Sequence, residues 1–110
     1  MSRLPPSLGI LVTGSCQTPE FSEFLQTASK ELRAGSKVYA YLLHDAVDGV
    51  PLPSLQNLRE RGLILHACAL AAFQRNIPNS DLAVFSGLVT LAELMARSDR
   101  FQTFSPKGST

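Results

Sequence analysis

The fold is decided by a short apolar run at residues 8–12, LGILV, which stops at Thr13, Gly14 and Ser15. A continuous apolar run of this length, bounded by turn residues, is typical of a strand buried on both faces inside a parallel sheet. Working outward from this run, four further segments are strand candidates: residues 38–43, 63–67, 82–85 and 100–104.

Helical signals separate these strands. Thr18 followed by Pro19 is a favourable helix start, because a capping hydroxyl precedes a proline at the first helical position, and Gly35 is well placed to end that helix. Ser54 is expected to cap a short second helix that closes at Gly62. Two more helices are expected at residues 69–75 and around Leu88, Leu91, Ala92 and Met95, which recur at helical spacing. This alternation predicts an α/β fold with a mainly parallel sheet of four to five strands and helices on both faces.

The composition fits one compact domain. The chain has 110 residues, 45% of them hydrophobic, and we expect one domain over residues 8–104 with flexible ends at 1–7 and 105–110. Charged residues make up only 17% and the net charge is +1, which argues against nucleic acid as a primary ligand. The longest apolar run, residues 67–73, is too short to span a membrane, and no signal peptide is recognisable. We therefore expect a cytoplasmic protein with no membrane partner.

Cys68 is the leading candidate for chemistry. It falls at the junction between a buried strand and the start of a helix, at the edge of the sheet where the carboxyl ends of parallel strands meet. The N–H groups and the dipole of a helix start favour the thiolate, which is the form that reacts as a nucleophile. The alternative is a small buried side chain without a chemical role, since free cysteines are often buried.

Three other side chains are candidates for assisting Cys68. His66 lies two residues before it and would share its face of a strand, and His44 follows the second strand; each is otherwise a structural or solvated histidine. Cys16 follows the first strand. In doubly wound sheets the first and third strands are often neighbours, so Cys16 would reach Cys68 and resolve a persulfide or disulfide there; otherwise it is an incidental thiol.

The spacing of residues argues against several other kinds of site. A cysteine phosphatase needs histidine directly before the cysteine and arginine six residues after it, but Ala67 and Gln74 stand at these positions around Cys68. The sequence has no Cys-x-x-Cys pair and no Gly-x-Gly-x-x-Gly fingerprint for a dinucleotide. It also has no metal-ligand spacing, so we expect neither a metal ion nor an organic cofactor.

Four segments, in this order, resemble the DsrE/DsrF-like sulfur-relay family: residues 11–14, residues 42–47, residues 66–75, and residues 85–94 followed by 99–101. In the third segment a cysteine opens an alanine-rich helix that ends in arginine, as Cys68 and Arg75 do here. The resemblance covers residues 8–104 and implies a flavodoxin-like three-layer sandwich. It also implies that Cys68 carries sulfur as a persulfide and passes it between partner proteins, and that the protein forms oligomers.

Two hypotheses of function follow. The first is a sulfur carrier or sulfurtransferase that accepts sulfane sulfur on Cys68 and relays it to a partner cysteine, with sulfur-donor and sulfur-acceptor proteins as partners. The second is a non-catalytic structural subunit of a sulfur-relay complex. A third reading, a small-molecule or nucleotide binder, is disfavoured because the sequence lacks a phosphate-binding glycine pattern.

The sparse charge and the large apolar groups around Leu88, Leu91 and Met95 and in the strand at residues 101–104 predict a patch that copies of the chain share. Closed symmetry is the default for such a patch, and the resemblance favours a homotrimer or homohexamer, with a hetero-oligomer as an alternative. The Cys68 edge is then expected to lie near a subunit boundary.

Overall fold

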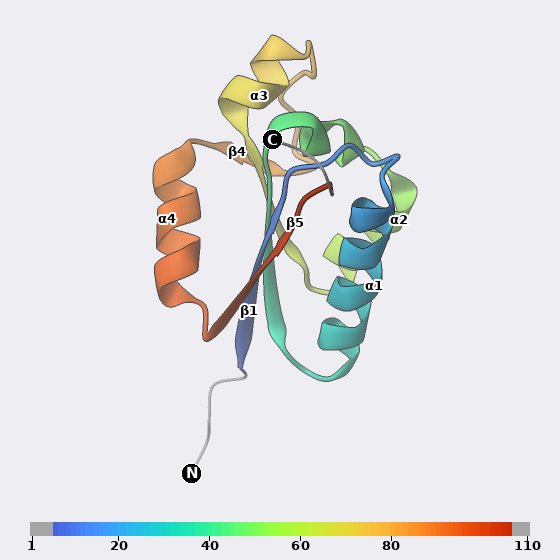
Figure 1. The fold of residues 1–110 in the computed structure, drawn as a ribbon, viewed down its shortest axis with the longest axis vertical. Coiled ribbons are helices and arrows are strands. Elements are labelled where there is room, and N and C mark those ends of the chain that lie inside the picture. Colours follow the sequence, from blue (N-terminus) through green and yellow to red (C-terminus); the bar gives the residue numbers. More distant parts are fainter. Residues whose placement is uncertain (1–5, 107–110) are drawn as a thin grey trace.

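The computed structural model describes residues 6–106 and shows a five-stranded sheet between two layers of helices (Figure 1). The strands are β1 (Ser7–Val12), β2 (Lys37–Leu42), β3 (Ile64–Cys68), β4 (Val84–Ser86) and β5 (Arg100–Phe104). The helices are α1 (Pro19–Arg33), the 3₁₀ helix η1 (His44–Gly49), α2 (Pro53–Glu60), α3 (Ala69–Gln74) and α4 (Leu88–Arg97). This is the three-layer α/β architecture that the alternating pattern predicts. Of the ends expected to be flexible, residues 1–5 and 107–110 lie outside the described residues, and Ser7 already belongs to β1.

The strands lie in the order β4-β3-β2-β1-β5, and every neighbouring pair is parallel. The chain adds β2, β3 and β4 outward from β1 and then returns with β5 to the other side of β1. The flavodoxin-like arrangement also puts one strand alone on the far side of β1, although there it is the second strand of the chain. The prediction that the first and third strands are neighbours is wrong, because β2 lies between them.

Helix α1 starts and ends where the sequence signals place it. Thr18 Oγ1 accepts the backbone N–H of Phe21 at 3.3 Å, and Pro19 is the first helical residue. Gly35 follows the end of the helix with a φ of 91°, a left-handed conformation that glycine adopts without steric cost. None of the helices in residues 6–106 has both the length and the hydropathy needed to cross a bilayer.

Strands β1, β2 and β3 begin one residue away from the predicted positions, and α2 and β4 also begin at other residues than the sequence predicts. Helix α2 begins at Pro53, so Ser54 lies inside the helix and is not its cap, because a proline is favoured at the first helical position. Strand β4 begins at Val84, two residues later than expected. The carbonyl of Leu82 lies outside the sheet and accepts a hydrogen bond from Nε2 of Gln56 on α2 at 3.0 Å.

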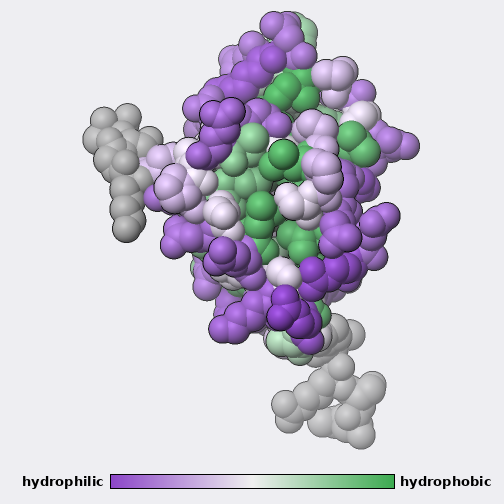
Figure 2. Space-filling view, turned by 90° about the vertical axis from the view of Figure 1, so that its right-hand side faces the viewer, coloured by the Kyte–Doolittle hydropathy of each residue, from purple (hydrophilic) through white to green (hydrophobic). Residues whose placement is uncertain are grey.

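The face of the sheet beneath α1 and α2 is closed. Phe21 and Phe24 of α1 are 1% and 0% exposed, and their rings meet edge to face with centroids 5.4 Å apart. They pack in one cluster with buried residues of the strands and of α2, including Leu8, Ile10, Val12, Val38, Leu42, Leu55 and Leu58. From outside, polar and charged side chains surround an apolar strip on this side of the molecule (Figure 2).

The opposite face is covered mainly by α4, with the short helix α3 at the upper end of the sheet (Figure 1). Helices therefore cover both faces, as predicted, but α3 and α4 bury fewer side chains against the sheet than α1 and α2 do. Leu94 is the buried residue of α4, whereas Leu88 and Met95 are 60% and 51% exposed. Two residues of the predicted apolar patch are therefore exposed, and its third, Leu91, is partly buried against the core. Because α4 is apolar around most of its circumference, periodicity alone could not identify the side that faces the sheet.

Candidate functional site

Cys68 is both the last residue of β3 and the N-terminal cap of α3. Its Sγ accepts the backbone N–H of Ala71 at 3.5 Å, and the residue is 6% exposed. The chain passes from strand to helix without a loop, so the sulfur lies at the carboxyl edge of the sheet, at the junction that the sequence predicts. Because α3 has only six residues, its dipole is small. The stabilisation of a Cys68 thiolate by the helix start therefore rests on this one N–H group.

A hollow of about 570 Å³ opens over Cys68. Its walls come from the start of η1, from α3 and from the start of α4: Leu43, His44, Cys68, Leu70, Ala71, Gln74, Gly87, Leu88 and Val89. Leu70 and Val89 are 63% and 76% exposed and form part of an apolar rim. A hollow of this size with mainly apolar walls and a few polar groups suits a small molecule or a side chain from another protein.

Tyr41 lies beside this hollow and was not expected as a site residue. It pairs with His66 between β2 and β3, it is fully buried, and its Oη donates to the carbonyl oxygens of Ser86 and Gly87 at 3.0 and 3.1 Å. Burial, and next the nearby charge of Cys68, raise the pKa of Tyr41 to about 12, so the hydroxyl keeps its proton at neutral pH. Tyr41 lies in an apolar strand segment, so the sequence pattern indicates a core residue there rather than a site residue. The signal that could have found it is that a buried tyrosine hydroxyl needs a partner.

His66 lies on the same face of β3 as Cys68, as its spacing predicts. Among residues 6–106, Nδ1 of His66 is buried and has no hydrogen-bond partner. Burial lowers the pKa of His66, so the imidazole is neutral at pH 7. The arrangement therefore provides a neutral base on the Cys68 face of the sheet.

His44 is exposed and lines the same hollow as Cys68. Its φ of 55° lies in the left-handed region, which is uncommon for residues other than glycine. The loop that carries it is tied to α3, because Nε and Nη2 of Arg75 donate to Oδ1 of Asp45 at 3.1 and 2.9 Å. The structure thus brings His44 and Cys68 to one hollow from two different elements.

Cys16 lies in a different environment. Its backbone N–H donates to Oδ1 of Asp48 at 2.8 Å, and Ser15 Oγ donates to Oδ2 of the same carboxylate at 2.5 Å. Burial, followed by the hydrogen bond and the negative charge of Asp48, raises the pKa of the Cys16 thiol and keeps it protonated. With β2 between β1 and β3, the expected route from Cys16 to Cys68 is absent, and the structure gives no support to Cys16 as a resolving thiol.

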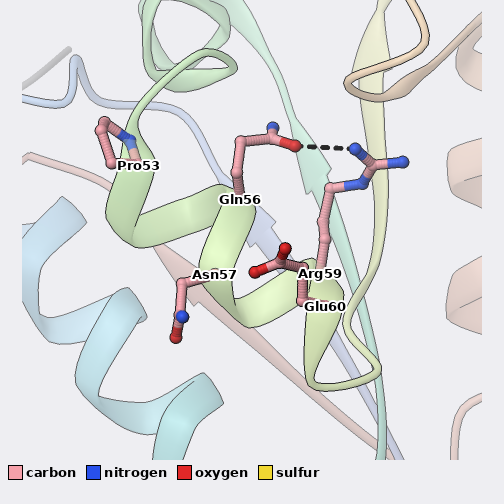
Figure 3. Close-up of a pocket in the computed structure, with 5 residues that line it drawn as sticks. All are labelled: Pro53, Gln56, Asn57, Arg59 and Glu60. Atoms are coloured by element: carbon pink, nitrogen blue, oxygen red, sulfur yellow. Dashed lines mark hydrogen bonds between the residues drawn. The ribbon is translucent and has the colours of Figure 1, made fainter.

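A second hollow lies on the outer side of α2 (Figure 3). It measures about 450 Å³ and is lined by Pro53, Gln56, Asn57, Arg59 and Glu60. Arg59 Nη1 donates to Gln56 Oε1 at 2.7 Å, and Gln56 Nε2 donates to the carbonyl of Val50 at 2.6 Å. The bond to Val50 attaches α2 to the preceding segment, whereas the Arg59–Gln56 bond lies within the helix. The wall carries no cysteine, serine or histidine, so we assign the hollow no chemistry. In the part of the chain that the structure describes, no three His, Cys, Asp or Glu side chains are grouped to hold a metal ion.

Comparisons with known proteins identify the fold. No protein-family model matches the sequence, and no curated protein matches it. Among solved structures, the chain is similar to the crystal structure of the YchN protein from E. coli, with a TM-score of 0.73 and 19% sequence identity. The match covers 90% of this chain and 99% of YchN. This chain and YchN therefore share one fold over nearly their whole lengths.

Proposed function

We propose that the protein is a sulfur carrier of the DsrE/DsrF-like kind, which accepts sulfane sulfur as a persulfide on Cys68 and relays it to a cysteine of a partner protein. The observation that carries this proposal is a cysteine sulfur in the wall of an apolar hollow, where strand β3 ends. The four sequence segments support it as well. The fold shared with YchN is of the sandwich kind that the resemblance implies.

The exchange requires only thiols. The Cys68 thiolate attacks the outer sulfur of a donor persulfide, R–S–SH, so that a new S–S bond forms, the donor's S–S bond breaks and R–S⁻ leaves. An acceptor thiolate then attacks the outer sulfur of the Cys68 persulfide, and Cys68 leaves as the thiolate. Sulfane sulfur moves with no net oxidation, so neither a metal nor an organic cofactor is needed.

The burial of Cys68 bears on the kind of partner. Because the residue is only 6% exposed, a donor or acceptor sulfur reaches it through the hollow and past the apolar rim. Partner proteins therefore present their cysteine on a protruding segment rather than on a flat surface. Apolar walls also keep water from the loaded sulfur, which limits side reactions of the persulfide.

The exposed side of α4 supports assembly with other copies of the chain, and the sequence resemblance favours homotrimers or homohexamers. Leu88, Val89 and Met95 are 60%, 76% and 51% exposed. Several large apolar side chains exposed on one helix are unusual on the surface of a monomer. Val89 also lines the Cys68 hollow, so a neighbouring copy packed on α4 would narrow access to the sulfur. In a hetero-oligomer, a different subunit would pack on the same exposed side of α4.

The alternative is a structural subunit of a sulfur-relay complex, and the low exposure of Cys68 is the observation that favours it. In that case α4 is the functional surface, and Cys68 is a core residue that contacts α3. The two functions differ in whether native Cys68 reacts.

Intact-protein mass spectrometry after incubation with glutathione persulfide tests the proposal. The parent protein and the matched control Cys16→Ser are expected to gain one sulfur atom that a reductant removes, whereas Cys68→Ser gains none. Adding a small acceptor thiol is then expected to discharge the sulfur from the loaded protein.

Two outcomes contradict the carrier function. If Cys68→Ser gains sulfur as readily as the parent, another group carries it. If the folded parent gains no sulfur while a mixed assembly with other proteins still forms through α4, the structural alternative holds.

A further inference from the structure

The hydroxyl of Tyr41 occupies a position defined by three strands. Tyr41 lies on β2 in register with His66 of β3, and β3 carries Cys68 two residues further on the same face. Its Oη donates to the carbonyl of Ser86, which is the residue of β4 in register with Cys68. The side chain thus reaches from β2 across β3 to β4, and its hydroxyl binds the β4 residue that is paired with Cys68.

The carbonyl partners of this hydroxyl belong to the wall of the same hollow. Oη donates to the oxygens of Ser86 and Gly87 at 3.0 and 3.1 Å, and Gly87 lines the hollow together with Cys68. A phenol has one proton, so two acceptors at nearly equal distance share it. Such a proton turns to a third acceptor nearby when that acceptor becomes negatively charged, because hydrogen bonds to ionised groups are the stronger ones.

We infer that Tyr41 is the hydrogen-bond donor that stabilises the sulfur anion at Cys68, first as the thiolate and then as the loaded persulfide. The inference rests on the proposed function only for the persulfide, since the thiolate forms with or without sulfur transfer. The raised pKa of Tyr41, caused in part by the charge of Cys68, agrees with a hydroxyl that keeps its proton beside this sulfur. No proton is transferred: the phenol donates a hydrogen bond and remains neutral.

Other charged and titratable groups near the site come from three elements. His66 lies on β3, His44 on η1, and Asp45 of η1 forms an ion pair with Arg75 at the end of α3. The parent and the Tyr41 variant share all of these groups, so the difference between their pH profiles reports on the Tyr41 hydroxyl.

The test is the rate at which iodoacetamide alkylates Cys68, measured against pH in a Cys16→Ser background. Tyr41→Phe keeps the ring and removes the hydroxyl. We expect the rate on the rising limb to fall about tenfold and the midpoint of the profile to move up by about one pH unit, as for the loss of one hydrogen bond to a charged group. The matched control is Tyr39→Phe, two residues earlier on the same strand and face, which is expected to leave the profile unchanged.

A purely structural role for Tyr41 predicts a different result. Tyr41→Phe would then lower the thermal midpoint of unfolding but leave the pH midpoint of alkylation in place, and that outcome overturns the inference. If Tyr41→Phe does not fold, 3-fluorotyrosine is incorporated in the Tyr39→Phe background, where Tyr41 is the one tyrosine present. The more acidic fluorinated phenol donates more strongly, so the alkylation midpoint is expected to move to lower pH, and an unchanged midpoint again overturns the inference.

The inference and the proposed function fail separately. Suppose that Tyr41→Phe shifts the alkylation profile but the parent protein gains no sulfur from glutathione persulfide. Tyr41 is then still a hydrogen-bond donor to Cys68, and the carrier function is wrong. If the parent protein gains sulfur but Tyr41→Phe does not shift the alkylation profile, the carrier function stands and the role of Tyr41 as a donor is wrong.

Discussion

The two faces of the sheet differ in how completely they are covered. Beneath α1 and α2, Phe21 and Phe24 are almost wholly buried and belong to the core cluster. On the other face, α4 buries Leu94 but leaves Leu88 and Val89 60% and 76% exposed. One face therefore has the packing of a finished core, and the other has an open apolar surface.

The difference separates the stabilising core from the candidate site. The closed face carries most of the large side chains that are fully buried, and burial of apolar groups is the main source of hydrophobic stabilisation. The open face carries Tyr41, His66 and Cys68, together with a hollow that another molecule can enter. Substitutions on the two faces are therefore expected to affect different measurements.

The largest effect is expected on the closed face. Phe24→Ala removes a fully buried ring between α1 and the sheet and leaves a cavity, which is expected to lower the free energy of unfolding by about 3–5 kcal/mol. Urea denaturation followed by circular dichroism measures this loss. A change below about 1 kcal/mol would mean that the face is less tightly packed than described.

On the open face, the substitution Met95→Lys is expected to change assembly rather than the fold. A charge placed on an exposed apolar helix surface opposes packing between copies, while the folding of each copy changes by less than about 0.5 kcal/mol. Light scattering should show the parent as an oligomer and the variant as a species of 11.9 kDa. The matched control is Glu93→Lys on the same helix, which changes the charge by more but removes no apolar group; if it dissociates the oligomer equally, the apolar argument is contradicted.

On the open face, His66 is expected to make the stability of the fold depend on pH. Because burial lowers the folded-state pKa of His66, the unfolded chain binds the proton more readily. The contribution of His66 to stability is therefore complete above the ordinary histidine pKa of about 6.5 and is lost as pH falls through the lowered folded value. His66→Gln is expected to flatten the fall in the thermal midpoint between about pH 7 and pH 5, and an equally steep fall would exclude His66 as its source.

The smallest effect concerns Glu31 on α1. Hydrogen bonds from Arg100, and next from Ser36, lower the pKa of Glu31, so its contribution to stability is present above the ordinary glutamate pKa and is lost as pH falls through the lowered value. Glu31→Gln should therefore reduce the loss of stability only in the most acidic range, and added salt should reduce the difference between the variants. A difference that persists at neutral pH and high salt would point to packing rather than charge.

The sequence predicts local structure better than neighbours in space. The proline after Thr18 and the glycine at position 35 define α1 because caps and turns depend on residues close in the chain. An apolar run such as residues 8–12 identifies a buried strand but not the strand beside it, which is why the position of β2 between β1 and β3 was missed.

The site follows the same rule. The place of Cys68 in the fold could be predicted because strand and helix signals meet at that residue. Tyr41 could not be assigned from the pattern, since its partners Ser86 and Gly87 lie more than forty positions away. The environment of Cys16 likewise depends on Asp48, which the 3₁₀ helix η1 brings to it.

The pairing of β1 with β5 has a consequence for the order in which the chain is made. β1 needs β2 on one side and β5 on the other, and roughly 90 residues separate β1 from β5, which takes on the order of ten seconds to synthesise. During that time one edge of β1 has unpaired N–H and C=O groups that another strand can bind. Every element of the Cys68 hollow precedes β5. A chain released early from the ribosome, just after α4, therefore contains all the residues of the site while its open β1 edge makes it prone to aggregate.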